Sequence, residues 1–375
     1  MAQAPASRDI GLCLSGGGYR AMIFHAGALI RINEAGLLPR VRAVSSVSGG
    51  SIIAAWLGIS WSKLQFDDHG VAKNLAEVIV DPLVEFASKG IDARAVLTGI
   101  VPGTISRRVQ KLYRKRLFGD ATLADLPARG EGPDFIITAT NLGTGALWRF
   151  SRFGVGDFRK SPEATDTGFF QAPTIPIATA VAASSAFPPV LSPCIFDASA
   201  FAEARAAQRQ VRLTDGGVFD NLGLEPLDGR EFKIVLCSDG GAPFKKKAKP
   251  PKTFLRGTVH VLKVIDLQVR KLRKEELIAT AQRGERKVAY WAVDGRPASY
   301  APAVIDENDA DPFEVLDVTD KAAEAMFGIS TRLAAMDLAQ QHRLINWGYA
   351  MCDAAVRRNV IEARCGQFPY AGGVG

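Results

Sequence analysis

Two short apolar runs near the start of the chain are each followed by a helical pattern. Ile10–Leu14 and Val41–Ser46 have the length and composition of buried strands. Between them, apolar residues recur at helical spacing from about Arg20 to Ala35, and Gly36 stands where helices commonly end. A second apolar helix pattern begins at Ile52. Strand, helix, strand and helix with short joints predict a parallel βαβ unit with a right-handed crossover.

The middle of the chain changes from a helical to a strand-like pattern. From Trp61 to about Pro127 the sequence is helical and amphipathic, which predicts an insertion or covering layer. Phe135–Thr140 and Ala146–Arg152 look like two strands of a hairpin, joined by a glycine-containing turn. Two further strands are expected at Val211–Thr214 and Ile234–Ser238.

The last third is expected to be mainly helical. One long helical pattern runs from about Thr258 to Ala289, and another from Ala334 to Arg357. We find no internal repeat and no clean domain break, so the sequence predicts one domain over residues 1–375. Its core is expected at about 10–357, with the helical insertion at about 61–127.

Composition narrows the class of protein. Of the 375 residues, 47% are hydrophobic and 23% are charged, which is typical of a globular protein and excludes a disordered chain. The five cysteines form no CxxC pair, which argues against a disulfide framework or a zinc site. Neither a signal peptide nor a run of about 18 apolar residues is visible. We therefore expect a cytoplasmic or peripheral membrane protein, with secretion without a signal also open.

The formal charge is +7, and the excess lies in clusters. Such clusters favour anionic partners, although solvated surface charge is the plainer interpretation. At Thr104–Leu117, apolar residues at helical spacing alternate with basic ones. This helix could lie on an anionic membrane, or it could pack its apolar side on the protein core. No nucleic-acid-binding motif is present, so no nucleic-acid partner is expected.

The strongest chemical signal is the segment Ser46-Val-Ser-Gly-Gly50 between a strand and a helix. It departs from the nucleophile-elbow pattern G-x-S-x-G only in having Ser46 for the first glycine. Ser48 would then stand at the tip of a sharp turn, with its hydroxyl exposed at the head of the following helix. The alternative is a helix cap without chemistry.

A second signal, Ser15-Gly-Gly-Gly-Tyr-Arg20, also joins a strand to a helix. Amides near Gly17 and Gly18, together with the Gly49 amide, could converge on one oxyanion at the positive ends of two helices. A dinucleotide site is the rival interpretation, but the second strand carries no acidic residue at its end. Arg20 could meet a substrate phosphate or support the loop.

Two aspartates could act as the base that activates the serine. Asp215 and Asp239 each follow a predicted strand and precede two glycines, although Asp-Gly is also a common turn pair.

Taken together, these motifs resemble the patatin-like phospholipase family. SGGGYR at 15–20, SVSGG at 46–50 and DGG at 215–217 occur in the family's order, and similar stretches extend the resemblance over about residues 10–357. The resemblance implies an α/β fold with a doubly wound, mostly parallel sheet flanked by helices. It implies Ser48 as nucleophile, Asp215 as base in preference to Asp239, and Gly16, Gly17, Gly18 and Gly49 as the oxyanion hole.

The expected function is therefore hydrolysis of fatty acyl esters in membrane phospholipids or lysophospholipids, without metal or other cofactor. A soluble carboxylesterase or thioesterase, and a catalytically silent lipid-binding module, are the alternatives. A serine–histidine–aspartate triad is not expected, because none of the four histidines follows a predicted strand. The sequence does not indicate an oligomeric state.

Overall fold

The computed structural model describes most of the chain, with several internal gaps. The described residues are 8–91, 104–158, 169–188, 191, 193–197, 199, 210–244, 253–301 and 313–375. The basic segment 245–252, the acidic segment 306–311 and residues 92–103 of the expected insertion lie outside them.

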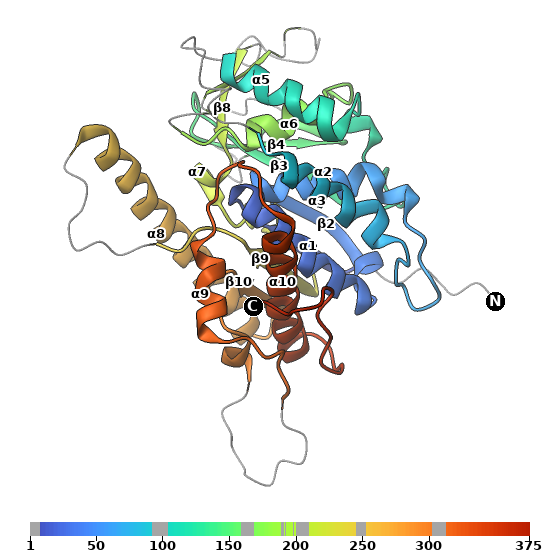
Figure 1. Ribbon diagram of the computed structural model, residues 1–375. Coiled ribbons are helices and arrows are strands. Elements are labelled where there is room, and N and C mark those ends of the chain that lie inside the picture. The colour runs from blue at the N-terminus through green and yellow to red at the C-terminus, as the bar shows by residue number, and fades with distance from the viewer. Residues whose placement is uncertain are drawn as a thin grey trace.

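A ten-stranded sheet runs through the molecule (Figure 1). Its strand order is β10-β9-β1-β2-β3-β4-β5-β6, with β8 paired to β3 and β7 paired to β8. The strands are β1 (Ile10–Leu14), β2 (Val41–Val47), β3 (Asp134–Asn141), β4 (Leu147–Ser151), β5 (Gly154–Phe158), β6 (Phe169–Phe170), β7 (Cys194–Asp197), β8 (Gln210–Asp215), β9 (Ile234–Asp239) and β10 (Lys287–Ala292).

The sheet is parallel in one half and antiparallel in the other. From β10 to β3 all neighbouring strands are parallel. The chain begins in the middle of this half, at β1, and extends it first to one side and then to the other, so the winding is double. Strands β4 to β8 pair antiparallel. The predicted α/β fold is thus confirmed, and "mostly parallel" describes only the half that contains β1.

Helices cover the sheet. They are α1 (Gly18–Glu34), α2 (Gly49–Ser60), α3 (Asp81–Lys89), α5 (Thr104–Tyr113), α6 (Ile177–Ser184), α7 (Gly217–Asp220), α8 (Phe254–Gln282), α9 (Asp320–Gly328) and α10 (Leu338–Asn359). Short 3-10 turns lie at Leu38–Arg40, Trp61–Lys63, Leu123–Asp125, Glu225–Leu227 and Pro297–Tyr300, and π-helical turns at Ala76–Val80 and Arg114–Phe118.

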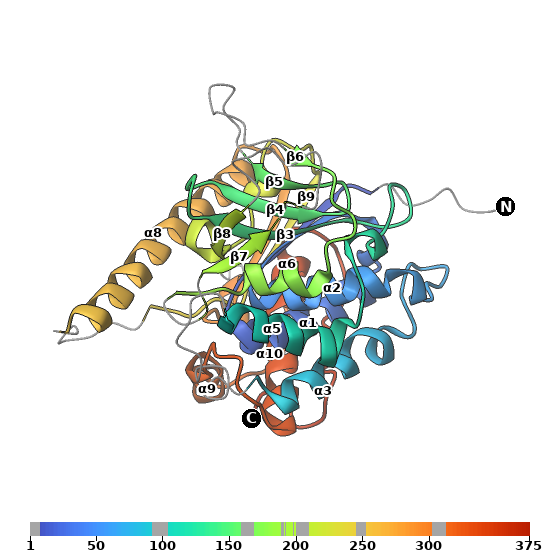
Figure 2. The same ribbon diagram turned by 90° about the horizontal axis from the view of Figure 1, so that it is seen from above.

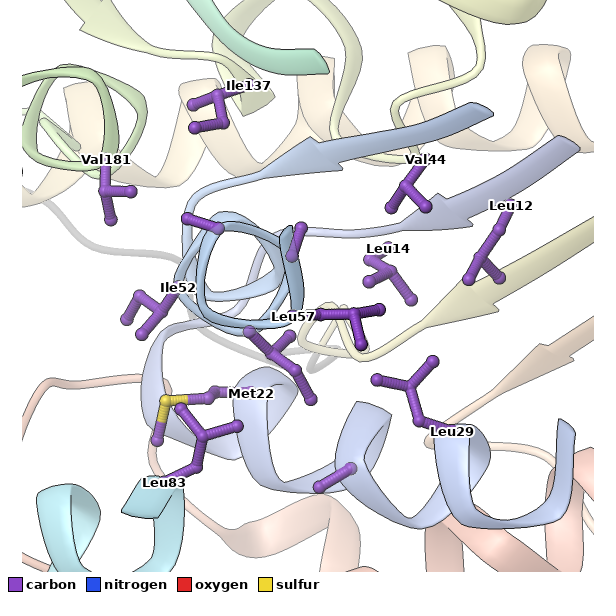
Figure 3. Packing of buried hydrophobic residues seen from close by; sticks show 14 of the residues in the cluster. Leu12, Leu14, Met22, Leu29, Val44, Ile52, Leu57, Leu83, Ile137 and Val181 are labelled. Carbon is purple, nitrogen blue, oxygen red and sulfur yellow. The ribbon is translucent and has the colours of Figure 1, made fainter. Parts of the chain in front are cut away.

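The two faces of the parallel half bury different sets of side chains. Successive residues of a strand point to opposite faces. Leu12 and Leu14 of β1 therefore join the large core beneath α1 and α2, where they lie near Leu29 of α1 (Figure 3). Cys13 points to the other face, into a smaller core that includes Leu277 of α8.

The prediction of one helix from Thr258 to Ala289 is wrong in its second part. Helix α8 ends at Gln282, and Lys287–Ala292 forms β10 instead. This strand pairs in parallel with β9 and buries Trp291 completely. Pairing with a distant strand has here prevailed over the local helical pattern, as tertiary context often does.

The amphipathic segment 104–117 packs against the core. In α5, Val109 and Tyr113 are 2% and 0% exposed, whereas Arg107 and Lys111 face solvent. Of the two alternatives for this helix, packing of its apolar side on the protein core is therefore the one that the structure supports. Across the described residues, no helix combines the length and apolar character needed to cross a bilayer.

The insertion at 61–127 contains shorter helices than its pattern suggested, separated by turns. The single-domain interpretation stays a prediction. It is supported by the single sheet that joins β1 near the start of the chain to β10 at Ala292.

Candidate active site

Ser48 occupies a strained turn between β2 and α2. Its backbone has φ 50° and ψ −116°, and among the described residues no other non-glycine residue has a positive φ. Such a conformation costs on the order of 1–3 kcal/mol and persists only where the surroundings enforce it. A side chain added at Gly49 would lie 2.0 Å from the Gly18 carbonyl oxygen, and one at Gly50 would lie 2.2 Å from that of Leu14. Close packing against the first strand and loop thus holds the turn.

A chain of serine hydroxyls lies beneath this turn. The Ser48 amide donates to Ser184 Oγ of α6 at 2.8 Å. Ser184 Oγ lies 2.9 Å from Ser51 Oγ, and Ser51 donates to Ser46 Oγ at 3.1 Å. Ser46 in turn donates to the Ile136 carbonyl at 3.2 Å. Ser46, which replaces the usual glycine, therefore both donates and accepts a hydrogen bond and helps to hold the turn at Ser48. Sequence reasoning missed Ser184, whose only signal was the small-residue stretch around it.

The glycine loop touches the serine turn directly. A side chain at Gly16 would come within 3.2 Å of Ser48 Cβ, and Gly17 and Gly18 have φ of 148° and 62°. Gly18 and Gly49 are the first residues of α1 and α2, so their amides have no partner within these helices. Both helix N-termini, with their positive partial charge, therefore meet beside Ser48.

Gly16 has a different place from the one predicted for it. Its amide donates to the Asn221 carbonyl at 3.1 Å, so it is already engaged. A side chain at this position would meet Asn221 Oδ1 at 2.3 Å. Gly16 thus allows two segments of the chain to approach closely, and its amide is not available to an oxyanion. Asn221 joins the glycine loop to the segment after Asp215.

Asp215 reaches the same place from the antiparallel half of the sheet. It ends β8 and lies opposite Ala139 near the carboxyl end of β3, whose Thr138 lies opposite Val47 of β2. The residue is 2% exposed, and Oδ1 accepts a hydrogen bond from the Gly217 amide at 2.8 Å. Burial raises the pKa of Asp215 to about 7, although hydrogen bonds from Gly217 and from the Ser48 side chain lower it.

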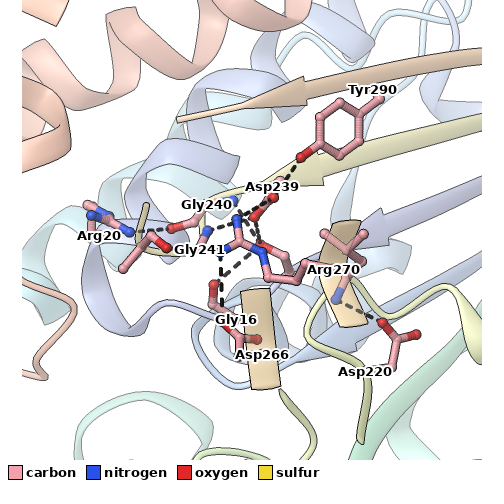
Figure 4. Close-up of polar contacts among 12 residues, drawn as sticks. Gly16, Arg20, Asp220, Asp239, Gly240, Gly241, Asp266, Arg270 and Tyr290 are labelled. Carbon is pink, nitrogen blue, oxygen red and sulfur yellow. Dashed lines mark hydrogen bonds and ion pairs between the residues drawn. The ribbon is translucent and has the colours of Figure 1, made fainter. Parts of the chain in front are cut away.

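Asp239 has a different environment, shown in Figure 4. Its carboxylate accepts hydrogen bonds from Arg270 at 2.6 Å, Tyr290 at 2.7 Å and the Gly241 amide at 2.9 Å. Burial acts to raise the pKa of Asp239, but the Arg270 charge and these hydrogen bonds outweigh it and hold the pKa below its ordinary value. Asp239 thus links the end of β9 to α8 and β10.

Arg20 is part of the same support. Its guanidinium is 1% exposed and donates to the carbonyls of Gly240 at 2.8 Å, Ile329 at 3.1 Å and Phe327 at 3.4 Å. Burial lowers the pKa of Arg20 to about 10. Of the two roles considered for this residue, these contacts favour support of the loop, since the buried guanidinium offers no surface to a substrate phosphate.

No described hydrogen bond joins a histidine to Ser48 or Asp215. His25 is fully buried, with Nδ1 2.7 Å from Ser238 Oγ and Nε2 3.0 Å from the Ser15 carbonyl. Burial lowers its pKa to about 4, so it is neutral near pH 7. Within the described ranges, no three His, Cys, Asp or Glu side chains come together as metal ligands would.

The candidate site lies in the part of the chain that matches a known protein family. The sequence model of the patatin-like phospholipase family matches residues 12–228, a range that contains Ser48 and Asp215. No curated protein sequence matches the chain.

Several solved structures are similar to the chain at low sequence identity. VipD from Legionella pneumophila is 18% identical, with 93% of this chain and 66% of that one covered and a TM-score of 0.39. Human GIVD cytosolic phospholipase A2 in complex with methyl gamma-linolenyl fluorophosphonate is 16% identical, with 94% and 57% covered and a TM-score of 0.48. The chain thus spans less than two thirds of either protein.

Proposed function

Because the chain belongs to the patatin-like phospholipase family, we propose that it is a lipid acyl hydrolase that uses Ser48 as nucleophile and Asp215 as base. Its substrates are fatty acyl esters of phospholipids or lysophospholipids, presented at a membrane surface. The observation that carries the proposal is the meeting of three features: a strained serine, a buried carboxyl without a cationic partner among the described residues, and two helix N-termini.

The chemistry follows from this arrangement. The Asp215 carboxylate accepts the proton of the Ser48 hydroxyl while Oγ bonds to the ester carbonyl carbon. The carbonyl electron pair moves onto oxygen, and the amides of Gly17, Gly18 and Gly49 stabilise that charge. When the tetrahedral intermediate collapses, the alcohol leaves with the proton from Asp215 and an acyl-serine remains. Water, deprotonated by the same carboxylate, then releases the fatty acid and restores Ser48.

The pKa of about 7 suits Asp215 to this part. Near neutral pH a large fraction of the carboxyl is ionised, yet it is a stronger base than an ordinary aspartate. Asp239, paired with Arg270, is the weaker base of the two.

The proposal is tested by labelling and by product analysis. A fluorophosphonate probe should label the protein at Ser48, and mixed phospholipids and lysophospholipids should release fatty acid detectable by mass spectrometry. Ser48→Ala should abolish both signals while changing the melting temperature little, because the half-buried hydroxyl contributes little to packing. Labelling at Ser15, Ser46 or Ser51 would contradict the assignment, and turnover of soluble esters alone would favour the carboxylesterase alternative.

A further inference from the structure

The amino-terminal ends of four neighbouring strands meet at the edge of the sheet opposite to Ser48. The Asp9 amide, just before β1, donates to the carbonyl of Arg40, just before β2, at 3.1 Å. The Lys233 amide, before β9, donates to the Asp9 carbonyl at 3.0 Å, and the amide of Lys287, which begins β10, donates to the Lys233 carbonyl at 2.9 Å. Helix α8 leads to the same edge, because its C-terminal part packs near β9 and β10 (Figure 2).

A pocket of about 610 Å³ lies at this edge. Small-molecule sites typically measure roughly 300–1,000 Å³, so the pocket has the size of such a site. We name it the basic pocket for the basic side chains that line it, which are Arg8, Arg42, Arg230, Lys233 and Arg286. Arg42 lies near the start of β2, and the other end of β2 leads to Ser48. At about 3.3 Å per residue these two positions are roughly 20 Å apart, so the basic pocket is separate from the candidate active site.

Two of the acidic side chains that line the basic pocket are bound to arginines outside it. Arg40 donates to both carboxylate oxygens of Asp9, at 3.0 and 3.1 Å. Glu285 forms an ion pair with Arg283. Neither arginine belongs to the lining, and Glu231 is the remaining acidic residue in it. The negative charge of the lining is therefore mostly neutralised from outside.

The positive charge of the basic pocket is not neutralised in this way. Arg230 lies 3.5 Å from Asp134, and within the described ranges it is the only one of the five basic side chains with a carboxylate partner. The other four form no ion pair with any described residue. Four unpaired cations thus stand in one recess beside a single unpaired acidic residue, so the pocket has a positive potential.

Uncharged groups hold two of the unpaired arginines in place. Arg8 donates to a main-chain carbonyl at 2.8 Å. Arg42 donates to the Glu231 carbonyl, and its guanidinium carbon lies 4.3 Å from the centre of the Phe232 ring. Arg286 has no hydrogen bond or ion pair to any described residue, and its Nε is buried. A guanidinium has five N–H donors, so most of the donors of these arginines remain for a ligand.

We propose that the basic pocket binds a phosphorylated ligand, with the guanidinium groups of Arg42 and Arg286 as its main contacts. The planar guanidinium fits two oxygens of a phosphate at once. A phosphate monoester or pyrophosphate carries about two or more negative charges, so it matches several cations better than a single carboxylate does. A free molecule and a lipid headgroup can both carry such a group, and the test distinguishes these two sources. The inference goes beyond the proposed function and does not depend on it.

Calorimetric titration of the full chain with inorganic pyrophosphate tests the proposal. The pocket variant combines Arg42→Ala and Arg286→Ala. A matched control combines Arg107→Ala and Lys111→Ala in α5, which removes the same charge from exposed side chains elsewhere. The variant Ser48→Ala shows whether the candidate active site takes part in the binding. Melting temperatures with and without pyrophosphate give a second measure, since a ligand of the folded state raises them.

The wild type should bind pyrophosphate, and the pocket variant should bind it about 100-fold more weakly, because two charge-assisted contacts are lost. The control and Ser48→Ala should bind it as the wild type does. Rising salt should weaken the binding. If the alanines lower the melting temperature, Arg42→Lys with Arg286→Lys replaces them. This pair should bind about tenfold more weakly than the wild type, because an ammonium group cannot form the paired hydrogen bonds.

Flotation with phosphatidylcholine vesicles, with and without phosphatidic acid, identifies the source of the phosphate. If phosphatidic acid recruits the wild type and not the pocket variant, the ligand is a lipid headgroup. If both proteins bind these vesicles equally and only the wild type binds pyrophosphate, the ligand is a free molecule. Either result supports the phosphate site.

Several results would overturn the proposal. One is the absence of both heat and a rise in melting temperature when the wild type meets pyrophosphate. Another is wild-type binding by the alanine or lysine pair. Equal weakening in the pocket variant and the control would show that net charge alone attracts the anion. Loss of binding in Ser48→Ala would place the anion at the candidate active site instead.

Discussion

Strands β8 and β9 each end in an aspartate that is followed by two glycines, and both aspartates are buried. Asp215 ends an antiparallel strand beside Ser48 and has no cationic partner among the described residues. Asp239 ends a parallel strand and is paired with Arg270 from α8. Burial alone would raise the pKa of both carboxyl groups, and the ion pair reverses the direction at Asp239.

The comparison shows how one local motif comes to lie in two different environments. Burying an ionised carboxylate without a partner costs free energy and raises its pKa, and perturbed pKa values of this kind are common in catalytic groups. A paired one joins parts of the structure, here β9, β10 and α8. The motif brings each aspartate to a strand end, and the residue that faces it decides its chemistry.

The largest expected effect is on catalysis. Asp215→Asn should lower kcat/KM by about 10³-fold or more, because the amide cannot accept the serine proton. Fatty acid release and fluorophosphonate labelling, measured with intact melting behaviour, check this. Asp239→Asn, assayed under conditions where it stays folded, is the matched control and should keep most of the activity. An exchange of these two phenotypes would show that Asp239 is the base.

Next in size is the stability of the Asp239 site. Asp239→Asn should lower the free energy of unfolding by about 3 kcal/mol at pH 7, because it leaves Arg270 without its buried partner. Chemical denaturation measures the change, and Asp215→Asn provides the comparison. Equal losses in the two variants would mean that the ion pair does not distinguish the sites.

The two sites should also give stability changes of opposite sign as pH varies. The folded-state pKa of Asp215 is raised from 3.8 to about 7. The contribution of this carboxyl group to the stability of the fold is therefore fully present below about pH 4 and is lost as pH rises through 7. Ionisation then costs up to about 4 kcal/mol. Asp215→Asn should therefore be more stable relative to wild type at pH 8 than at pH 5.

For Asp239 the folded-state pKa is lowered, so its stabilising contribution is present above the unfolded pKa and lost as pH falls through the folded one. The deficit of Asp239→Asn should shrink in acid. Thermal melts of both variants and the wild type from pH 4 to pH 8 check these signs. If the stability difference from wild type changed with pH in the same way for both variants, the different environments assigned to Asp215 and Asp239 would be contradicted.

The smallest effect is on the pH dependence of the rate. With Asp215 as base, kcat/KM of the wild type should fall about tenfold per pH unit below about pH 7, since only the carboxylate accepts the proton. Asp239→Asn should leave this midpoint nearly unchanged. A midpoint near pH 4 in the wild type would show that Asp215 is not held in the apolar environment described.

The sequence alone determined the features that depend on short stretches of chain. Buried strands at Ile10–Leu14 and Val41–Ser46, the glycine loop and the turn at Ser48 were all predicted, and the structure contains them with shifts of a residue or two. Alternation of side chains and the conformational freedom of glycine act within a few residues, so they leave a direct pattern. The roles of Ser48 and Asp215 stay proposals.

Tertiary structure decided what depends on neighbours far along the chain. Arg270 lies 31 residues from Asp239, and no local pattern shows that it faces that aspartate and not Asp215. Pairing with β9 made Lys287–Ala292 a strand, and packing on α6 buried the apolar side of α5. On α8 the pattern predicted a long helix, but only the structure shows that Arg270 and Arg273 of this helix pair with Asp239 and Glu225. Burial and pKa are set by whatever surrounds a side chain in space, and a sequence states those surroundings only for its near neighbours.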